Sequence, residues 1–374
     1  MKKSGTPVRL GVVFGTRPEA IKLYPLLVAL APQVERGAVA LCTISTGQQP
    51  DLLEQSLQLL NISPDYELAL GRGGSNLATT HARMVESLTT VMHDESLDGV
   101  LVQGDTLTAF SAALAAFYAR IPVHHVEAGL RTWDPNHPFP EEIHRRWITH
   151  VTHTHYCPTV QAQSNLIQEG VSPDRIVLVG NTVIDAMRLV NERITLPNEL
   201  PKSGGRRIFF TSHRRENLDR LEGHILPAIR TIVEQSRDVD VVVSVHPNPA
   251  VEQAMHRYLA GHERIHLMRP LDYTEALGLV RDSTLVVTDS GGLQEEATAL
   301  GTPVMILRRV TERIEAVDAG CALVVGTDAH SVSQRIMAVL DDESVLNQMA
   351  KPSRVFGDGY AADRIVAHLL GDAV

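Results

Sequence analysis

Short apolar runs alternate along the chain with longer stretches in which apolar residues recur every three or four positions. The short runs are rich in β-branched residues, a pattern typical of strands buried on both faces. They predict strands at residues 8–14, 39–44, 99–102, 123–126, 155–157, 207–211, 239–245, 265–268, 284–288 and 304–307. The longer stretches predict helices at residues 20–30, 51–60, 77–93, 108–118, 161–168, 221–234, 294–300 and 360–370. Strands and helices that alternate at this spacing indicate parallel sheets covered by helices on both faces.

The alternation is interrupted once, at residues 195–206, where two prolines and two glycines stand in a stretch without periodicity. Such a stretch is typical of a linker between domains. It divides the chain into halves of similar size, each with about five predicted strands. A chain of 374 residues is long enough for two or three domains, so we expect an α/β protein with two parallel-sheet domains.

Composition and charge narrow the range of functions. The chain is 44% apolar and 21% charged, which is ordinary for a soluble globular protein. It has 34 Lys and Arg against 44 Asp and Glu, and this net charge of -10 argues against nucleic acid or an anionic membrane as the main partner. The three cysteines form no disulfide framework, and no apolar run approaches the ~18–20 residues of a membrane span. These features predict a cytoplasmic protein.

The polar residues that follow the strands are the most informative, because parallel sheets bind ligands at the carboxyl ends of their strands. In the first half they are carboxylates, namely Asp105, Glu127, Glu141 and Glu142. In the second half they are mostly basic or small, namely His213, Arg214, Arg215, Ser290, Gly291, Gly292, Arg308, Arg309 and Arg313. If the two edges face each other, acid–base groups line one wall of a cleft and anion-binding groups the other. A nucleotide-bearing substrate with a second reacting part would require such a site.

The Ser290-Gly291-Gly292 turn is predicted to open a helix, where free N–H groups and the helix dipole favour a phosphate. The glycines would let a ligand approach the backbone closely, but the same turn can simply connect a strand tightly to a helix. The arginines that follow the next strand favour phosphate binding. Asp105 also has a structural alternative, because it stands where a helix N-cap is expected.

Two histidine patterns could suggest a metal, and neither has the expected geometry. Residues 262–266 match HExxH, which binds zinc only when both histidines share one face of a helix. Gly261 should end the preceding helix, and the motif then continues into a predicted strand, which sets the histidines roughly 13 Å apart. The histidines within 150–155 straddle a predicted helix end and strand start. We therefore expect no metal, and the chain has no GxGxxG or GxxxxGK[ST] motif for a dinucleotide or a P-loop.

The residues at the strand ends also carry a family resemblance, to the non-hydrolysing UDP-N-acetylglucosamine 2-epimerases. It begins at residues 14–22, Phe-Gly-Thr-Arg-Pro-Glu-Ala-Ile-Lys, and runs essentially to the end of the chain. This first motif, with Pro18 and Lys22, resembles the non-hydrolysing branch rather than the hydrolysing one. The other matching stretches are residues 104–106, 126–132, 180–185, 213–216, 289–296 and 357–359.

The resemblance implies two Rossmann-like domains that face each other across a cleft, in the glycosyltransferase-B arrangement. The expected domains are residues 1–180, with the catalytic carboxylates, residues 181–356, which bind UDP, and a helix within 357–374 that crosses back to the first domain. The family interconverts UDP-N-acetylglucosamine and UDP-N-acetylmannosamine for surface polysaccharide synthesis. It uses no cofactor and is commonly dimeric, so we expect a homodimer.

An elimination explains the residue types that this reaction needs. The hydrogen at sugar C2 is not next to a carbonyl, so its direct removal is difficult. UDP instead leaves C1 as a base takes the C2 proton, which gives a glycal. UDP then adds again, with protonation from the other face. This route requires a base, an acid and donors that hold the departing diphosphate.

The matching positions imply specific roles. Asp105, Glu127 and Glu141 are the acid–base candidates, with His213 near the diphosphate, and the residues do not decide which carboxylate takes the proton. The implied substrate-binding residues are Arg17, Lys22, Arg214, Ser290, Gly291, Gly292, Glu296 and Arg313. Among these, the Ser-Gly-Gly turn would hold the diphosphate, Glu296 would accept from the ribose hydroxyls, and Arg313 would contact UDP or the sugar.

Two positions depart from the family pattern. Ala276 stands where the family usually has an aromatic residue near the uracil, so base stacking is expected to be weaker or supplied elsewhere. After the second strand, residues 48–51 read Gln-Gln-Pro-Asp in place of a Gln-His-Arg run that helps to form a second, activating substrate site. Pro50 cannot supply the charged donor, so we expect weak or no substrate activation.

Three alternatives share this fold. A hydrolysing epimerase would release free N-acetylmannosamine and UDP. A glycosyltransferase would need an acceptor groove, which a sequence does not reveal. A UDP-sugar sensor would bind without turnover, but a binding protein has no need for Asp105, Glu127 and Glu141 together.

Overall fold

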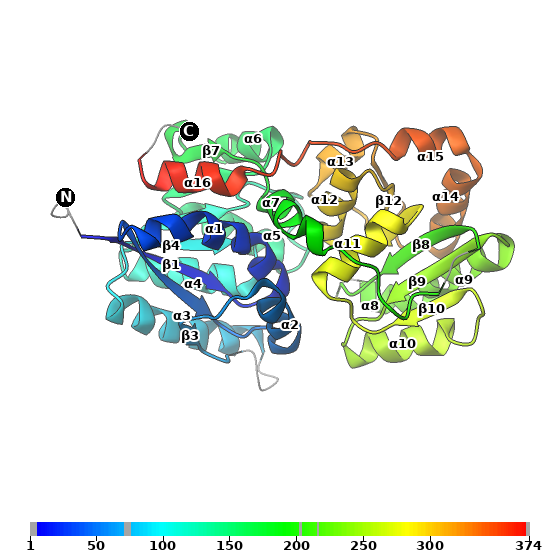
Figure 1. The fold of residues 1–374 in the computed structure, drawn as a ribbon, viewed down its shortest axis with the longest axis horizontal. Coiled ribbons are helices and arrows are strands. Elements are labelled where there is room, and N and C mark those ends of the chain that lie inside the picture. The colour runs from blue at the N-terminus through cyan, green and yellow to red at the C-terminus, as the bar shows by residue number, and fades with distance from the viewer. Residues whose placement is uncertain (1–5, 71–75, 202–203, 215–216, 372–374) are drawn as a thin grey trace. The chain divides into compact units, whose positions relative to one another are not determined.

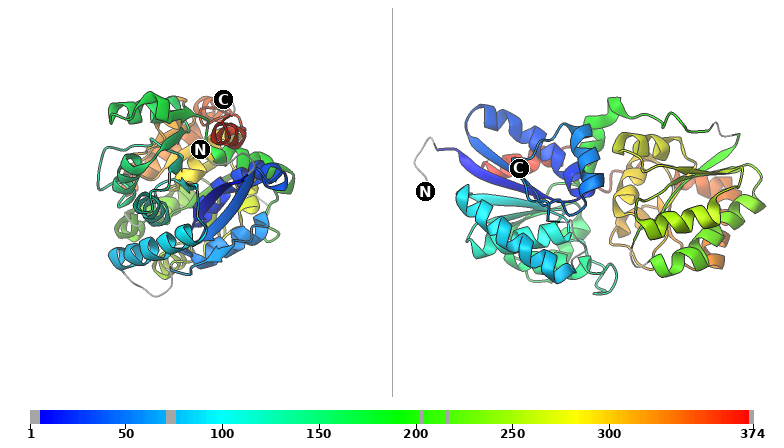
Figure 2. Two further views of the ribbon diagram at one scale, coloured as in Figure 1. Left: turned by 90° about the vertical axis from the view of Figure 1, so that its left-hand side faces the viewer. Right: turned by 90° about the horizontal axis from the view of Figure 1, so that it is seen from below.

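The computed structural model describes all residues except 1–5, 71–75, 202–203, 215–216 and 372–374. The chain forms two compact units, Met1–Leu189 with Gly357–Val374, and Val190–Phe356. Each unit is a parallel sheet with helices on both faces (Figure 1 and Figure 2). The irregular stretch at residues 195–206 therefore lies within the second unit, where the backbone of Thr195 packs closely against Gly278. No helix in the described part of the chain is both long and apolar enough to span a membrane.

The sheet of the first unit has seven strands in the order β3-β2-β1-β4-β5-β6-β7. The strands are β1 (Val8–Phe14), β2 (Val39–Ser45), β3 (Tyr66–Glu67), β4 (Gly99–Gln103), β5 (Val123–Val126), β6 (Thr154–Cys157) and β7 (Ile176–Leu178). The helices are α1 (Arg17–Glu35), α2 (Pro50–Leu60), α3 (Leu77–Asp94), α4 (Leu107–Tyr118), α5 (Glu141–Val151), α6 (Val160–Gln168), η1 (Pro173–Arg175), α7 (Thr182–Val190) and α16 (Ala361–Leu369). The strand order reverses between β1 and β4, and ligands bind at such a switch point in open α/β sheets.

The sheet of the second unit has six strands in the order β10-β9-β8-β11-β12-β13. The strands are β8 (Arg206–Thr211), β9 (Val239–Ser244), β10 (Ile265–Met268), β11 (Leu285–Thr288), β12 (Val304–Ile306) and β13 (Ala322–Val324). The helices are η2 (Asn191–Arg193), α8 (Leu218–Arg220), η4 (Leu221–Ile225), α9 (Leu226–Gln235), α10 (Pro249–Leu259), α11 (Tyr273–Asp282), α12 (Gly291–Leu300), α13 (Ile314–Asp318), α14 (Ala329–Asp341) and α15 (Glu343–Met349). Here the order reverses between β8 and β11, so the two units share one switch-point topology.

The burial of the strands explains why the apolar runs in the sequence predicted them. Strands β1, β4, β8 and β11 are almost wholly buried, and their near-continuous Val, Ile, Leu and Phe side chains form the cores on both sides of each sheet. All ten predicted strands are confirmed to within one residue at each end. The strands that the pattern missed, β3, β7 and β13, have two or three residues each and lie at sheet edges, where apolar runs are short.

The last helix belongs to the first unit. In α16, Ile365 and Val366 join the apolar cluster that includes Leu23 and Leu26 of α1. The Ala362 N–H donates to the buried carboxylate of Asp185 on α7 at 2.8 Å. The chain therefore leaves the first unit after α7 and returns to it with α16.

Candidate active site

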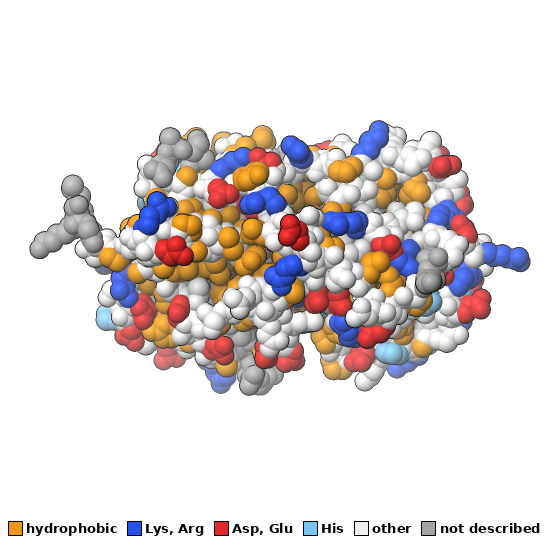
Figure 3. Space-filling model, viewed as in Figure 1, with side chains coloured by type: hydrophobic (Ala, Val, Ile, Leu, Met, Phe, Trp, Pro, Cys, Tyr) orange, Lys and Arg blue, Asp and Glu red, His pale blue; other side chains and the backbone are white. Residues whose placement is uncertain are grey.

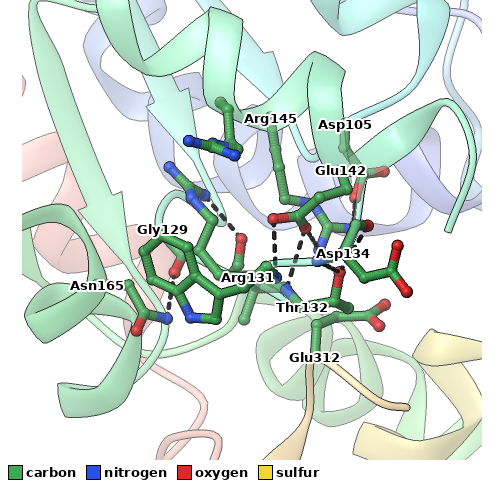
Figure 4. Close-up of polar contacts among 12 residues, drawn as sticks. Asp105, Gly129, Arg131, Thr132, Asp134, Glu142, Arg145, Asn165 and Glu312 are labelled. Atoms are coloured by element: carbon green, nitrogen blue, oxygen red, sulfur yellow. Dashed lines mark hydrogen bonds and ion pairs between the residues drawn. The ribbon is translucent and has the colours of Figure 1, made fainter. Parts of the chain in front are cut away.

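Asp105 lies at the carboxyl end of β4, beside the switch point of the first unit. Its carboxylate forms an ion pair with Arg145, which comes from α5 and is almost fully buried (Figure 4). The backbone oxygen of Asp105 lies 3.1 Å from Nδ1 of His144, the neighbouring residue of that helix. The N-cap role belongs to Thr106, whose hydroxyl accepts from the Ala109 N–H at 3.0 Å. Helix α5 therefore holds Asp105 at two points, its carboxylate through Arg145 and its backbone oxygen through His144.

Glu127 follows the neighbouring strand β5 and is held in an unusual backbone conformation, with φ +64°. Its carboxylate forms a buried ion pair with Lys22 of α1 and accepts from Asn181 Nδ2 at 3.1 Å. A left-handed backbone costs a residue with a side chain roughly 1–3 kcal/mol and is most often kept at functional sites. The structure thus brings together two predicted site residues, Lys22 and Glu127, that are far apart in the sequence.

Glu141 and Glu142 begin α5, but they lie in different surroundings. Glu141 is half-buried at the first residue of the helix. Glu142 is fully buried and accepts from the backbone N–H groups of Thr132 and Trp133 at 3.0 and 3.1 Å (Figure 4). The Glu142 carboxylate also lies 3.3 Å from the guanidinium of Arg145. Through these two side chains, α5 links the backbone of residues 132–133 to the carboxylate of Asp105. The acid–base role of Glu141 remains a prediction.

The turn between β1 and α1 is organised by Glu19. Arg17 is the first residue of α1, and Glu19 is buried beneath this turn. Glu19 accepts from the N–H groups of Gly15 and Thr16 at 2.9 and 2.8 Å, and from the hydroxyl of Thr106 at 2.5 Å. Burial raises the pKa of Glu19 to about 7, although these hydrogen bonds oppose the shift. Glu19 therefore joins the loops that carry Arg17 and Asp105. The sequence analysis assigned Glu19 no role beyond its place in the first motif.

The corresponding edge of the second unit is organised by Asp289, which follows β11 and is fully buried. Its carboxylate accepts from the hydroxyl of Ser212 at 2.8 Å, the Arg214 N–H at 3.1 Å and Asn217 Nδ2 at 2.9 Å. Burial favours a raised pKa, but the charge of His213 and these hydrogen bonds outweigh it and hold the pKa of Asp289 below its usual value. Asp289 therefore fixes the loop that carries the predicted residues His213 and Arg214. The rest of the 213–216 motif, residues 215–216, lies outside the described residues.

The Ser290-Gly291-Gly292 turn opens α12, as predicted, with Ser290 as its N-cap. A Cβ atom on Gly291 would lie 2.7 Å from Cζ of Arg313, so the guanidinium packs directly on this glycine. Arg313 is buried, donates to Glu295 at 2.9 Å and pairs with Glu312. The turn and Arg313 therefore lie together, but two carboxylates of this unit already neutralise the arginine.

Two further predicted positions lie on the helices of the second unit. Glu296 lies at the middle of α12 and is buried. Ala276 lies within α11 and is partly buried.

The two arginines that follow β12 differ in exposure. Arg308 is buried and pairs with Glu312 at 2.9 Å, whereas Arg309 is exposed. Lys and Arg side chains are interspersed with Asp and Glu on the face drawn in Figure 3.

The histidine patterns have the local structure expected of them. Gly261 has φ +81°, His262 precedes β10 and His266 lies within it, so the HExxH match does not lie on a helix. The 150–155 cluster straddles the end of α5 and the start of β6. Among the described residues no group of three or more His, Cys, Asp and Glu side chains is placed to hold a metal ion.

The fold and its comparison with solved structures define a two-domain α/β protein of the glycosyltransferase-B class. A crystal structure of UDP-GlcNAc 2-epimerase from Neisseria meningitidis bound to UDP-GlcNAc matches with a TM-score of 0.93 and 34% identity, over 98% of this chain and 100% of that one. The Methanocaldococcus jannaschii UDP-GlcNAc 2-epimerase in complex with UDP-GlcNAc and UDP matches with a TM-score of 0.85 and 32% identity, over 97% of this chain and 99% of that one.

Sequence comparison identifies the family. The family model for UDP-N-acetylglucosamine 2-epimerase matches residues 33–370. The UDP-N-acetylglucosamine 2-epimerase of Yersinia pestis is 42% identical over 367 residues, which are 96% of this chain and 97% of the relative. The chain belongs to the UDP-N-acetylglucosamine 2-epimerase family, whose members are isomerases. The resemblance found in the sequence motifs is thereby confirmed.

Proposed function

We propose that this chain interconverts UDP-N-acetylglucosamine and UDP-N-acetylmannosamine by elimination and re-addition of UDP, and so supplies a precursor for surface polysaccharide. The observation that carries this proposal is the pair of carboxylates on neighbouring strand ends of the first unit. Asp105 and Glu127 each contact a buried cation, Arg145 and Lys22 respectively. Two fixed carboxylates suit a reaction that removes a proton on one face of a carbon and returns it on the other.

The chemistry assigns each bond change to a type of group. A carboxylate takes the proton from C2, the electrons of that C–H bond form the C1–C2 double bond, and the C1–O bond breaks with its electrons on UDP. In the return step UDP attacks C1 of the glycal, and a second group protonates C2 from the opposite face. Asp105, Glu127 and Glu141 are the candidates for these proton transfers. No electrons leave or enter overall, so the reaction needs no redox cofactor.

The second unit supplies groups suited to the departing diphosphate. His213 and Arg214 lie on the loop after β8, and Ser290, Gly291 and Gly292 lie after β11, on the two sides of the switch point. We infer that UDP binds at this edge, with Glu296 at the ribose and Arg313 behind the turn. We further infer that Arg17 and Lys22 of the first unit contribute to substrate binding. The enzyme would act in the cytoplasm as a homodimer.

The decisive experiment mixes the purified chain with UDP-N-acetylglucosamine in D2O, without metal or NAD, and follows the reaction by proton NMR. UDP-N-acetylmannosamine with deuterium at C2 would establish the elimination and the epimerase activity. Free N-acetylmannosamine and UDP would assign the chain to the hydrolysing reaction. A lack of any product would instead favour a glycosyltransferase or a UDP-sugar sensor.

A further inference from the structure

The peptide groups on both sides of Asp105 are held by imidazole rings. The carbonyl oxygen of Gly104 lies 2.7 Å from Nε2 of His125, which is on β5. The carbonyl oxygen of Asp105 itself lies 3.1 Å from Nδ1 of His144, which is on α5. A carbonyl oxygen accepts hydrogen bonds and cannot donate them, so each ring must donate from the nitrogen that faces the peptide. Two consecutive carbonyl groups of the loop after β4 are therefore fixed by side chains of two different elements.

His125 is a buried member of the sheet, paired with Val102 of β4. The next residue of β5, Val126, accepts from the backbone N–H of Gly104 at 3.0 Å. Gly104 has φ +69°, a conformation that glycine adopts without strain, and turns the chain at the end of β4. A Cβ atom on Gly104 would lie 3.7 Å from Oε1 of Glu127. Strand β5 therefore holds both the N–H and the carbonyl group of Gly104, and it brings the Glu127 carboxylate beside the same residue.

The ring of His144 is held by a stack of aromatic side chains. It stacks on Phe110 of α4, with centroids 5.0 Å apart and an interplanar angle of 15°. Phe110 stacks in turn on His81 of α3, at 4.8 Å and 6°, and Nδ1 of His81 lies 2.8 Å from the hydroxyl of Ser111. Stacking fixes the plane of a ring and therefore the direction of its N–H groups. Three helices thus contribute to the ring that donates to the Asp105 carbonyl.

The two contacts require opposite tautomers of the two rings. Burial lowers the pKa of His125 to about 4 and holds the pKa of His144 below its usual value, so both rings are neutral at pH 8. A neutral imidazole carries a single N–H. His125 must then carry its proton on Nε2, and His144 must carry its proton on Nδ1.

We propose that His125 and His144 are positioning residues, two neutral donors that hold the peptides on either side of Asp105 and so set the direction of its side chain. The two peptides that flank a residue determine where its Cα–Cβ bond points, and a misplacement of about 1 Å can cost a reaction 10²-fold. A neutral donor holds the backbone without placing a further positive charge beside the carboxylate, which would make it a weaker base. The proton transfer by Asp105 rests on the proposed function, whereas the two hydrogen bonds rest on the geometry alone.

The tautomers are read from the full chain labelled with 15N, through long-range proton–nitrogen correlations of the imidazole rings at pH 8. The variants His125→Gln and His144→Asn each remove one set of signals and so assign the two rings. We expect the Nε2–H form for His125 and the Nδ1–H form for His144. Either ring in the other tautomer would overturn its hydrogen bond to the loop. The tautomers belong to the wild-type protein, so this result stands even where a variant fails to fold.

Paired variants test the effect of the two donors on the reaction. His125→Gln and His144→Asn keep an amide N–H as many bonds from Cα as the donating ring nitrogen, whereas His125→Met and His144→Leu remove the donor. We expect the Met and Leu variants to lose about 10²-fold in kcat, with KM and calorimetric UDP affinity close to those of the wild type. The Gln and Asn variants should recover most of this loss.

His155→Leu is the matched control. His155 is buried on β6 directly beside His125, and neither of its ring nitrogens has a hydrogen-bond partner among the described residues. We expect this variant to keep the kcat of the wild type at pH 8.

The outcomes separate this inference from the proposed function. A wild-type kcat in folded His125→Met and His144→Leu would overturn the positioning role. Equal losses in His125→Gln and His125→Met would show that the shape of the ring matters rather than its N–H, and would overturn the donor role of His125. No conversion by the wild type in D2O would count against the proposed function, and the tautomers would still decide the two hydrogen bonds. Conversion together with the opposite tautomers would count against the present inference alone.

Discussion

Lys22 and Glu127 form an ion pair in the interior of the first unit, although 105 residues separate them in the sequence. The exposed fractions of their side chains are 5% and 6%. The pair connects the first turns of α1 to the residue that follows β5, and Asn181 Nδ2 also donates to the carboxylate. The importance of so deeply buried a pair is measured by the free energy of unfolding that is lost when one of its partners alone is replaced.

We predict that Lys22→Met destabilises the first unit by about 3–5 kcal/mol, because it removes the cation that pairs with the buried Glu127 carboxylate. Glu127→Gln should have a similar cost, since it removes the anion that pairs with the buried Lys22 ammonium. The double variant should recover most of the loss, since both charges are gone. Denaturant unfolding of the four proteins gives the coupling directly. Glu35→Gln, an exposed change on the same helix, serves as the control, and additive losses in the double variant would refute the prediction.

Asp105→Asn should leave UDP binding nearly intact and remove turnover. The amide keeps the shape of the side chain but cannot act as an acid or a base, and such groups contribute roughly 10²–10⁴-fold to the rate. The measurement pairs calorimetric binding of UDP with the rate of C2 exchange in D2O. Asp94→Asn is the matched control, because Asp94 is exposed at the end of α3. A wild-type kcat in Asp105→Asn would remove this residue from the reaction.

The glycines after β11 provide a matched pair of variants. Gly291→Ala would bring a methyl group to 2.7 Å from Cζ of Arg313, and the guanidinium is held by Glu295 and Glu312, so it cannot move aside freely. We expect this variant to lose about 1–3 kcal/mol of stability through overpacking and to bind UDP at least tenfold more weakly. Gly292→Ala meets no atom within 4 Å and should unfold like the wild type.

Thermal unfolding and UDP calorimetry of both variants test the role of the turn. Equal UDP affinity in the two proteins would show that the contact between Gly291 and Arg313 does not shape the binding site. Weak binding by Gly292→Ala without loss of stability would instead show that the ligand itself approaches that glycine closely.

The sequence predicted the strand-end positions of the site because parallel sheets are read reliably from apolar runs. Asp105, Glu127 and His213 were found by this rule alone. Arg145, the partner of Asp105, was not found, since it lies on α5, which was not among the predicted helices. Glu142 was named as a carboxylate, but its burial against the 132–133 backbone was not foreseen. Asp289 begins the 289–296 stretch of the family resemblance, but its contacts with the loop after β8 depend on the pairing of β8 with β11. The positive φ of Glu127 could not be predicted from its residue type.

The loop after β2 carries a prediction about regulation. Pro50 is the first residue of α2, where its lack of an N–H is harmless, and it offers no donor to a ligand. Gln48 is already engaged, because its Oε1 accepts from the N–H and the hydroxyl of Thr108 at 3.0 and 2.9 Å. We therefore expect weak or no activation by substrate. Initial rates of the reverse reaction should not rise when a small amount of UDP-N-acetylglucosamine is added, and a sigmoidal rate curve that rises on this addition would contradict the prediction.

Three histidines of β5 and β6 predict that the first unit is sensitive to acid. Burial lowers the pKa of His124 and His125 to about 4 and that of His155 to about 3. Neither ring nitrogen of His155 has a hydrogen-bond partner among the described residues. The unfolded chain, with ordinary histidines, therefore binds up to three more protons than the folded chain between about pH 6.5 and pH 4. Stability from these groups is present above pH 6.5 and is lost as the pH falls through this window.

Glu19 acts in the opposite direction, because its raised pKa of about 7 means that the folded state binds the extra proton. The stability that Glu19 contributes is fully present below the ordinary glutamate pKa and is lost as the pH rises through 7. For these four groups the net difference is about two protons between pH 4.5 and 6.5, so together they should lower the free energy of unfolding by about 3 kcal/mol for each pH unit lost. Both tryptophans, Trp133 and Trp147, lie in the first unit, so their fluorescence in urea reports that unit alone. His155→Leu should reduce the slope by about one proton, or ~1.4 kcal/mol per pH unit, and a slope equal to that of the wild type would show that His155 is not held neutral.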